Sequence, residues 1–314
     1  MNASDGGAED VSFFTPRILI PFLLVSLIWG STWIVIKDQI TEIPPLWSIT
    51  YRFIAASAAM FAIVAIRKQP FLLDRRGQFW AICLGISQFM LNFNFVYRAE
   101  FYVTSGLVAV MFALLMVPNA ILGRIFLGQR INAPFVIGSL IAMAGIAMLF
   151  VQEYRIASTG PGAIFIGVAF TAGGILAASV ANVLQATDGP KRYPILTLLA
   201  WSMLWGMLAN ATLAVLTAGP PVVEPRLGYF AGLLYLGMIG SAVTFPLYFA
   251  MLREIGAARA AYSSVLVPIV AMALSTVFEG YRWSGLAAGG AALALIGLLI
   301  AMRARRARVP RLQG

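Results

Sequence analysis

Histidine is absent from the 314 residues, and Cys83 is the single cysteine. One cysteine cannot form an intramolecular disulfide, and the usual zinc ligand sets need histidine or several cysteines. All twelve carboxylates lie in the expected tails, in loops or at helix ends. General acid-base and nucleophilic mechanisms need a poised histidine, carboxylate or activated thiol. We therefore predict that the protein is not an enzyme, has no catalytic residue and uses neither a metal nor a cofactor.

Charged residues are scarce as well, at 11 % of the chain against 61 % hydrophobic residues, and the mean hydropathy is +0.88. A helix that crosses a membrane needs about 20 mostly apolar residues. Ten apolar stretches have 19 or more residues, and nine of them contain no charge: 18–36, 45–66, 79–97, 101–123, 131–152, 161–187, 195–218, 227–252, 260–278 and 283–302. The short connections leave no room for a soluble domain. We predict an all-α integral membrane protein with ten transmembrane helices.

Basic residues gather on one side of this predicted topology. Of the 22 lysines and arginines, 16 lie in the tails and the even-numbered connections and five lie in the odd-numbered ones. Because positively charged segments stay in the cytoplasm, we expect both tails, 1–17 and 303–314, to be cytoplasmic in a plasma (inner) membrane. The net charge of +10 then reflects topology and lipid contact rather than nucleic-acid binding. No basic residue precedes Arg17, unlike in a cleaved secretory signal, so we expect 18–36 to be retained.

The two halves of the chain resemble one another at a distance of 152 residues. This shift aligns seven pairs of identical residues: Leu122, Phe126, Gly128, Arg130, Gly138, Ala142 and Gly145 with Leu274, Phe278, Gly280, Arg282, Gly290, Ala294 and Gly297. Five helices per half is an odd number, so the halves 18–152 and 161–302 must have opposite orientations in the membrane. Inverted repeats are typical of secondary transporters, whose substrate path lies at the repeat interface near the midplane.

Short motifs occur in a fixed order along the two halves. They are Trp29-Gly30-Ser31 with Lys37, Arg52-Phe53, Leu127-Gly128, and Gly256-Ala257-Ala258-Arg259-Ala260 before Pro268. In this order they resemble the EamA-type members of the drug/metabolite transporter superfamily. The family's Leu-Gly-Glu signature is altered, to Leu127-Gly128-Gln129 and to Phe278-Glu279-Gly280. The resemblance implies a ten-helix bundle that exports small metabolites, and the chain is similar to the branch of the family that exports aromatic amino acids.

Polar and aromatic residues within the spans are candidates for a substrate site. Polar groups in lipid need partners, so each could instead form hydrogen bonds between helices. Their recurrence favours a shared cavity among helices one, three, four, six, eight and nine, which suits a molecule with a hydrophobic side chain and a polar backbone. The predicted substrate-binding residues are Trp33, Gln88, Asn92, Tyr97, Met111, Met116, Ser179, Asn182, Thr244, Tyr248, Tyr262 and Ser263.

Arg52 is the one charged residue within a span. As a structural residue it would extend toward the membrane surface or pair locally. If it faces a cavity instead, it could hold a substrate carboxylate.

Glycine and proline predict the moving and the rigid parts. Pro118, Pro246 and Pro268 and the pair Gly173-Gly174 interrupt helices, as hinges for alternating access or as static kinks. On helices five and ten, small residues stand four positions apart, Gly138 with Ala142 and Gly285 with Gly289. This spacing favours close contact, so we predict that these two helices form a rigid pair away from the substrate path.

Together these features predict an exporter of small neutral metabolites, above all hydrophobic or aromatic amino acids, that works by alternating access. Because the spans contain no carboxylate, facilitated or exchange transport is favoured over proton-coupled antiport. Other drug-like metabolites or nucleotide sugars are alternative substrates, and a membrane enzyme or receptor-like scaffold is the alternative outside transport. The expected partners are a small-molecule substrate and membrane lipid, and the sequence assigns no oligomeric state.

Overall fold

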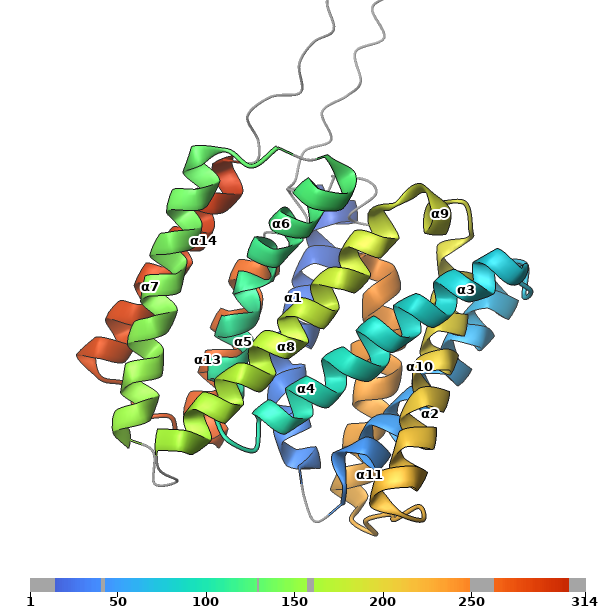
Figure 1. The fold of residues 1–314 in the computed structure, drawn as a ribbon. Coiled ribbons are helices and arrows are strands. Elements are labelled where there is room, and N and C mark those ends of the chain that lie inside the picture. The colour runs from blue at the N-terminus through green and yellow to red at the C-terminus, as the bar shows by residue number, and fades with distance from the viewer. Residues whose placement is uncertain (1–14, 41–42, 129, 157–160, 249–262, 305–314) are drawn as a thin grey trace, which may run out of the picture.

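The computed structural model describes residues 15–40, 43–128, 130–156, 161–248 and 263–304 (Figure 1). Within these ranges the chain forms helices and no strand. Eight helical segments are long and apolar enough to span a membrane, and two shorter apolar helices, Leu266–Phe278 and Gly285–Ala301, stand where the ninth and tenth spans are predicted. The predicted all-α, ten-helix membrane fold is confirmed.

Several predicted spans are built from more than one helical segment, some of them π or 3-10 helices. The elements of the first half are α1 (Pro16–Gln39), α2 (Pro45–Ile66), α3 (Arg75–Leu84), η1 (Gly85–Leu91), α4 (Asn92–Ala99), α5 (Ser105–Phe112), η2 (Ala113–Leu115), α6 (Met116–Leu127) and α7 (Ala133–Ile156). Those of the second half are α8 (Pro161–Ala186), α9 (Asp188–Lys191), α10 (Ile195–Ala218), α11 (Leu227–Leu234), η3 (Tyr235–Val243), α13 (Ser263–Phe278) and α14 (Gly285–Ala304).

Successive spans run in opposite directions, so the bundle has two distinct ends (Figure 1). We call the end where α1 begins and α14 ends the tail end, and the end where α1 ends and α2 begins the opposite end. The largest core cluster surrounds α2, η1 and α4, where the Phe53 ring centroid lies 5.2 Å from that of Phe89 and 5.1 Å from that of Phe93. Large apolar side chains on the outer surface, such as Phe126 and Leu216, are exposed, as a lipid-facing surface requires.

Local chemistry accounts for several helix ends. Pro16 and Pro45 occupy first-turn positions of α1 and α2, where an N–H group has no helical partner. The Asp74 carboxylate caps α3 by accepting a hydrogen bond from the Gly77 N–H at 2.7 Å. Gly128 ends α6 with a φ of +64°, and Gly280, its counterpart in the repeat, follows α13 with a φ of +67°. Glycine adopts this left-handed conformation without strain, which explains why both halves carry it there.

A π-helix interrupts the third and the eighth span at matching places. The 152-residue shift carries the range of η1, 85–91, onto 237–243, which lies within η3. π-segments of this kind are often found at functional sites in helical proteins. Here both segments border the cavity described below.

The fourth span changes to a 3-10 segment, η2, directly before Pro118. Proline has no N–H group to donate, and its ring crowds the carbonyl four residues earlier, which belongs to Leu114 of η2. Pro118 therefore breaks the regular helix at the place predicted for a hinge. In contrast, α8 is continuous past Gly173 and Gly174, and both glycines serve close packing, Gly173 against the Phe95 ring.

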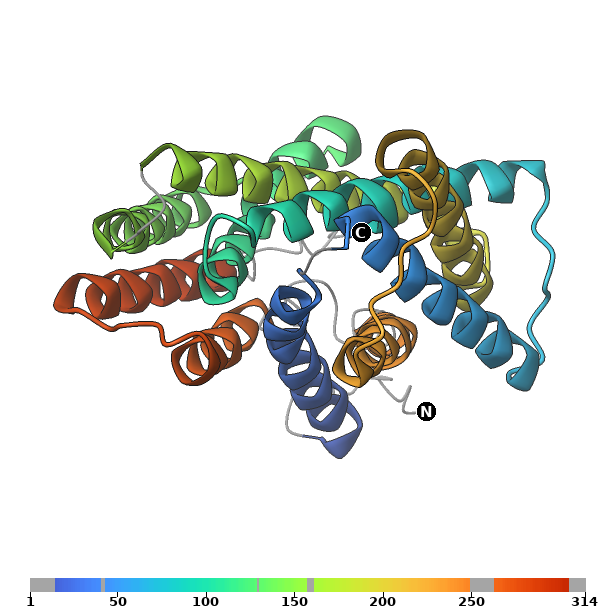
Figure 2. The same cartoon turned by 90° about the horizontal axis from the view of Figure 1, so that it is seen from below.

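Helices α7 and α14 lie side by side at one edge of the bundle (Figures 1 and 2). A Cβ atom on Gly145 would lie 2.3 Å from the Ala294 nitrogen, and one on Gly297 would lie 2.2 Å from the Ala142 nitrogen. The shift of 152 residues exchanges these two contacts, so each half contributes the same surface to the interface. This is how two inverted copies related by a pseudo-twofold axis pack together.

The predicted contact between the fifth and tenth helices is thus confirmed, but half of its predicted residues were wrong. A Cβ on Gly285 would meet nothing within 4 Å, and one on Gly289 would meet only the Met148 methyl group, at 3.3 Å. Gly290, Ala294 and Gly297 form the α14 side instead. Spacing alone shows that small residues share a helix face, but it does not show which face meets the neighbour.

We predict that Gly145→Ala lowers the free energy of unfolding by about 1–3 kcal/mol, because the added methyl group has no space against α14. Gly285→Ala is the matched control and should leave stability almost unchanged. The melting temperature of each purified variant in detergent measures the difference. Equal melting temperatures would contradict the close packing of α7 and α14.

Candidate substrate cavity

A cavity of about 750 Å³ extends through the centre of the bundle toward the tail end. Its wall comes from both halves: from α1, α2, η1, α4, α5, η2 and α6 in the first, and from α8, α9, α10, η3 and α13 in the second. No residue of α7 or α14 lines it, in agreement with the predicted separation of that pair from the path. The volume is in the range typical of sites for small molecules.

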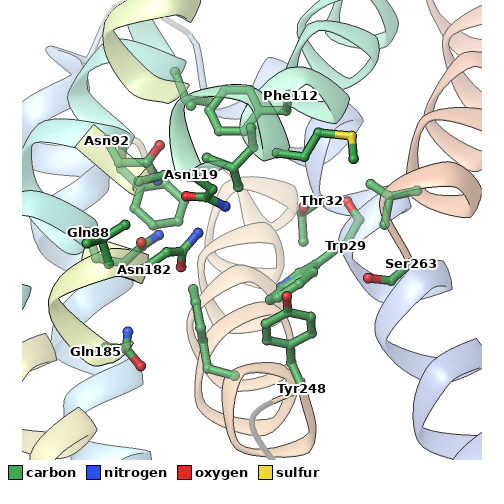
Figure 3. A pocket seen from close by; sticks show the side chains of 18 of the residues that line it. Trp29, Thr32, Gln88, Asn92, Phe112, Asn119, Asn182, Gln185, Tyr248 and Ser263 are labelled. Atoms are coloured by element: carbon green, nitrogen blue, oxygen red, sulfur yellow. Dashed lines mark hydrogen bonds between the residues drawn. The ribbon is translucent and has the colours of Figure 1, made fainter. Parts of the chain in front are cut away.

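One side of the cavity is polar. Gln88 of η1, Asn92 of α4, Asn119 of α6 and Asn182 of α8 direct their amide side chains toward a common space (Figure 3). The Oδ1 atoms of Asn92 and Asn119 are buried without a hydrogen-bond partner. Buried polar atoms are nearly always paired, so these two oxygens are free to accept hydrogen bonds from a ligand.

The other side is aromatic. The Trp29 ring centroid lies 5.0 Å from that of Tyr248 and 5.4 Å from that of Phe245, and the Trp33 centroid lies 5.0 Å from that of Phe112. These side chains line the cavity from α1, α5 and the helical residues 244–248 (Figure 3). Such a wall can pack against a flat or hydrophobic group.

Each residue of the Trp29-Gly30-Ser31 motif makes a different contact. Trp29 faces the cavity and donates its indole N–H to the Gly240 carbonyl of η3 at 3.3 Å. Gly30 lies against α13, where a Cβ atom would be 2.5 Å from the Val270 Cβ. The Ser31 hydroxyl is 2.6 Å from the Tyr235 hydroxyl. The motif thus joins α1 to both elements that flank it in the second half.

Arg52 lines the cavity on the side of the opposite end and is only 2 % exposed. Its Nη2 donates to the Ser241 hydroxyl at 3.2 Å, and its Cζ lies 4.2 Å from the centroid of the Phe93 ring. Its Nε and Nη1 have no partner in hydrogen-bond geometry, although the Tyr97 hydroxyl and the Glu100 carboxyl interact with the guanidinium group. The residue is anchored on one edge, as the structural interpretation requires, and has donors without a bonded partner on another, as the carboxylate-binding interpretation requires.

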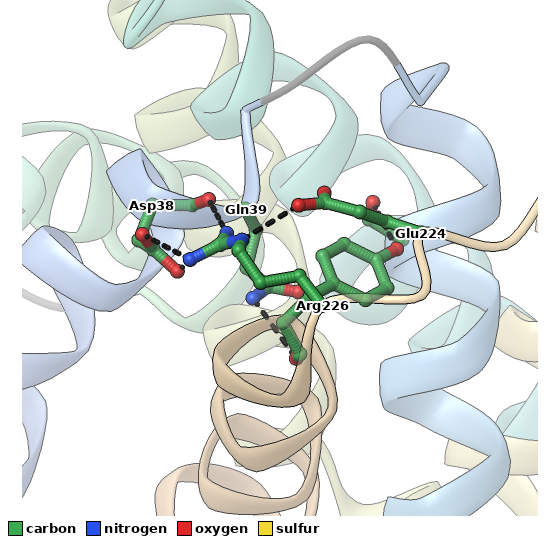
Figure 4. A network of polar contacts seen from close by, with 6 residues as sticks. Asp38, Gln39, Glu224 and Arg226 are labelled. Carbon is green, nitrogen blue, oxygen red and sulfur yellow. Dashed lines mark hydrogen bonds and ion pairs between the residues drawn. The ribbon is translucent and has the colours of Figure 1, made fainter.

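Polar contacts join the helices at the opposite end. Arg226 donates to both carboxylate oxygens of Asp38 at 3.0 Å and to Glu224 at 2.6 Å (Figure 4). These hydrogen bonds raise the pKa of Arg226 above its ordinary value. Beneath this network Gln39 donates to the Tyr229 carbonyl, and the Tyr229 hydroxyl meets Ser48 at 2.7 Å. The contacts hold α1 and α2 against the start of α11.

At the tail end, Tyr193 lines the cavity and donates its hydroxyl to Asp74 at 2.6 Å. This bond, together with the Gly77 N–H, lowers the pKa of the Asp74 carboxyl. The two residues tie the start of α3 to the segment that follows α9. The cavity also borders Lys191 there, so its rim carries a positive charge.

Most of the predicted site residues line the cavity: Trp33, Arg52, Gln88, Asn92, Met116, Asn182, Tyr248 and Ser263, together with the predicted hinge Pro268. Tyr262 lies outside the described residues. Sequence reasoning missed Thr32, Asn119 and Gln185. Asn119 directly follows Pro118, so its place next to the predicted hinge proline was the signal in the sequence that could have identified it.

Four predicted residues lie elsewhere, buried outside the cavity: Tyr97, Met111, Ser179 and Thr244. Thr244 donates its hydroxyl to the Ile239 carbonyl at 2.6 Å, five residues earlier, because the π-turn of η3 shifts the backbone. Ser179 precedes Asn182 by three residues, yet only Asn182 faces the cavity. Neither Pro118 nor Pro246, Gly173 or Gly174 lines it. Among the described residues no group of histidine, cysteine or carboxylates could hold a metal ion.

Comparison with known proteins shows a related family. A sequence model of the EamA-like transporter family matches residues 17–151 and again residues 162–303. A probable amino-acid metabolite efflux pump of Salmonella typhimurium is 24 % identical and aligns with 88 % of this chain and 92 % of its own. The uncharacterized inner membrane transporter YedA of Escherichia coli is 26 % identical over 81 % of this chain and 80 % of its own. A crystal structure with 19 % identity shares the fold, with a TM-score of 0.68 over 91 % of this chain and 97 % of that one.

Two asparagines on α4 provide a test that distinguishes a residue facing the cavity from one that packs between helices. Asn94 donates to Asn210 Oδ1 at 2.6 Å and to the Met90 carbonyl, whereas Asn92 faces the cavity. We expect Asn94→Ala to cost about 1 kcal/mol of stability, because an interhelical hydrogen bond is lost. Asn92→Ala should leave the melting temperature in detergent unchanged. An equal loss for both variants would contradict the placement of Asn92 in the cavity wall.

Proposed function

The chain belongs to the EamA-like transporter family, and on that basis we propose that it exports small neutral metabolites, foremost hydrophobic or aromatic amino acids, from the cytoplasm. The observation that carries the substrate class is the division of the cavity into an aromatic wall, an amide wall and a buried arginine with free donors. An amino acid offers one group to each of the three.

Each group of such a substrate finds a chemically matched partner. The carboxylate would accept hydrogen bonds from the free Nε and Nη1 of Arg52, since a guanidinium group is suited to planar carboxylates. The ammonium group would donate to the Asn92 and Asn119 oxygens. The side chain would pack on Trp29 and Tyr248.

The distribution of charge supports a cytoplasmic tail end. The tails and the connections at this end carry most of the lysines and arginines, as positive-inside topology requires. The cavity extends to the same end, so substrate would bind from the cytoplasm. The relation to YedA supports the inner membrane, and the relation to the efflux pump supports export of amino-acid metabolites.

In this proposal the two repeats, 18–152 and 161–302, move against each other about the cavity between them. Pro118, Pro246 and Pro268 would allow the gate helices to bend, and α7 and α14 would remain packed. Facilitated or exchange transport is sufficient, because none of the described residues that line the cavity is a carboxylate.

The test is counterflow in proteoliposomes without an ion gradient, with labelled phenylalanine as substrate. We expect saturable exchange that large neutral amino acids inhibit. Arg52→Gln should weaken phenylalanine binding by about tenfold or more, because a hydrogen bond to a charged group contributes about 1.5–3 kcal/mol. Arg52→Lys should retain part of the activity.

Phenylalaninamide is the matched control, since it lacks the carboxylate and should compete equally in the wild type and in Arg52→Gln. Unimpaired exchange of phenylalanine by Arg52→Gln would refute the carboxylate-binding role. Loss of folded protein from the membrane in both Arg52 variants would show that the residue is structural.

A further inference from the structure

Glu100 follows α4 at the opposite end of the bundle and is completely buried, at 0 % exposure. Both of its carboxylate oxygens lack a hydrogen-bond partner. The sequence placed it only among the carboxylates of tails, loops and helix ends. The loop that joins α4 to α5 packs against α1, so this carboxyl group lies within the protein.

The neighbours of Glu100 are committed to other partners. The Lys37 amine of α1 donates to the backbone carbonyls of Glu100 and Val103. The Glu279 carboxylate, just past α13, accepts from the backbone N–H and the hydroxyl of Ser105 on α5. The Ser105 hydroxyl therefore does not reach Glu100.

Charged or titratable side chains from several neighbouring elements act on Glu100. Lys37 of α1 and Arg52 of α2 favour the ionised form, while Glu279 disfavours it, and Tyr97 of α4 lies nearby. Burial is the largest influence and raises the pKa of the Glu100 carboxyl well above its ordinary value. An ionised carboxylate that is buried without a hydrogen bond is costly, so in this arrangement the neutral acid is favoured.

We propose that the Glu100 carboxyl group is a proton-binding site that is occupied while the opposite end is closed and that releases its proton when that end opens and water reaches it. The inference depends on the proposed function only in requiring that this end opens during the cycle. A proton that is taken up and released on the same side biases the equilibrium without being transported. Exchange without an ion gradient therefore remains compatible with this site.

The sign of the pH dependence follows from linkage. The closed form holds the proton more tightly than the open form, so a low pH stabilises closure. As the pH rises from the ordinary carboxyl pKa toward the raised one, the ratio of open to closed protein should increase by up to about tenfold per pH unit. Above the raised pKa the ratio should become constant.

Thiol labelling measures this equilibrium without any substrate. In a Cys83→Ser background, Val103→Cys places a thiol at a position that is 3 % exposed, in the loop that carries Glu100. Phe101→Cys, at a position that is 46 % exposed, corrects for the pH dependence of the thiol reaction itself. The ratio of the two labelling rates by a methanethiosulfonate reagent is measured from about pH 5 to about pH 9.

We expect this ratio to rise with pH in the otherwise unchanged protein and to remain low and flat in Glu100→Gln, which mimics the neutral acid. Glu224→Gln is the matched control, because Glu224 lies at the same end but is paired with Arg226, and it should keep the wild-type slope. Glu100→Asp should also keep a slope, which distinguishes titration from damage to the fold.

A flat ratio in the wild type, or a wild-type slope in Glu100→Gln, would overturn the proposal. These outcomes are independent of the counterflow test. A protein that failed to exchange amino acids could still show the labelling response, and an active exchanger could lack it.

Discussion

The structure depends on the requirement that polar groups surrounded by lipid find their partners inside the protein. Helices satisfy the backbone, and hydroxyl side chains such as Thr171 and Ser202 donate to carbonyls of their own helices. The polar atoms that remain unpaired are therefore informative. They include Nε of Arg52 and Oδ1 of Asn92, which border the cavity, and the oxygens of Glu100 at the opposite end of the bundle. The chain leaves hydrogen-bonding capacity unused where a ligand, a proton or water can supply the missing partner.

Hydrophobic length was sufficient to predict the number of helices, and the spacing of small residues predicted the contact between the fifth and tenth helices. The first signal arises from the membrane itself, which requires long apolar segments. The direction in which a single side chain points was harder to predict. Asn182 and Ser179 are polar neighbours on one helix, but only Asn182 reaches the cavity. Thr244 was displaced by the π-turn before it, which no composition rule reveals. Glu100 was missed because a position beyond the end of an apolar span gives no information about burial in the folded loop.

The bundle has two parts, the helices that line the cavity and the closely packed pair α7 and α14. Helices α7 and α14 contact each other through glycine and alanine, with backbones in direct contact and no polar group facing the path. The other spans carry the interruptions, namely two π-helices, one 3-10 segment and the prolines of α6 and α13. Irregular backbone is tolerated in a membrane where it borders a cavity or lies within protein. The irregular elements therefore border the cavity together with the regular helices α1, α2, α8 and α10, and the regular pair α7 and α14 stands outside it.

The matching positions of the two π-helices bear on how the two halves of the chain arose. The hydrogen bonds of a π-helix join residues five apart instead of four, so a π-turn holds one residue more than an α-turn. Here the extra residue occupies matching places in both halves, 85–91 and 235–243. Two separate insertions at one position would be a coincidence. The simplest history places the extra residue in an ancestral five-helix protein, before gene duplication and fusion produced the present chain.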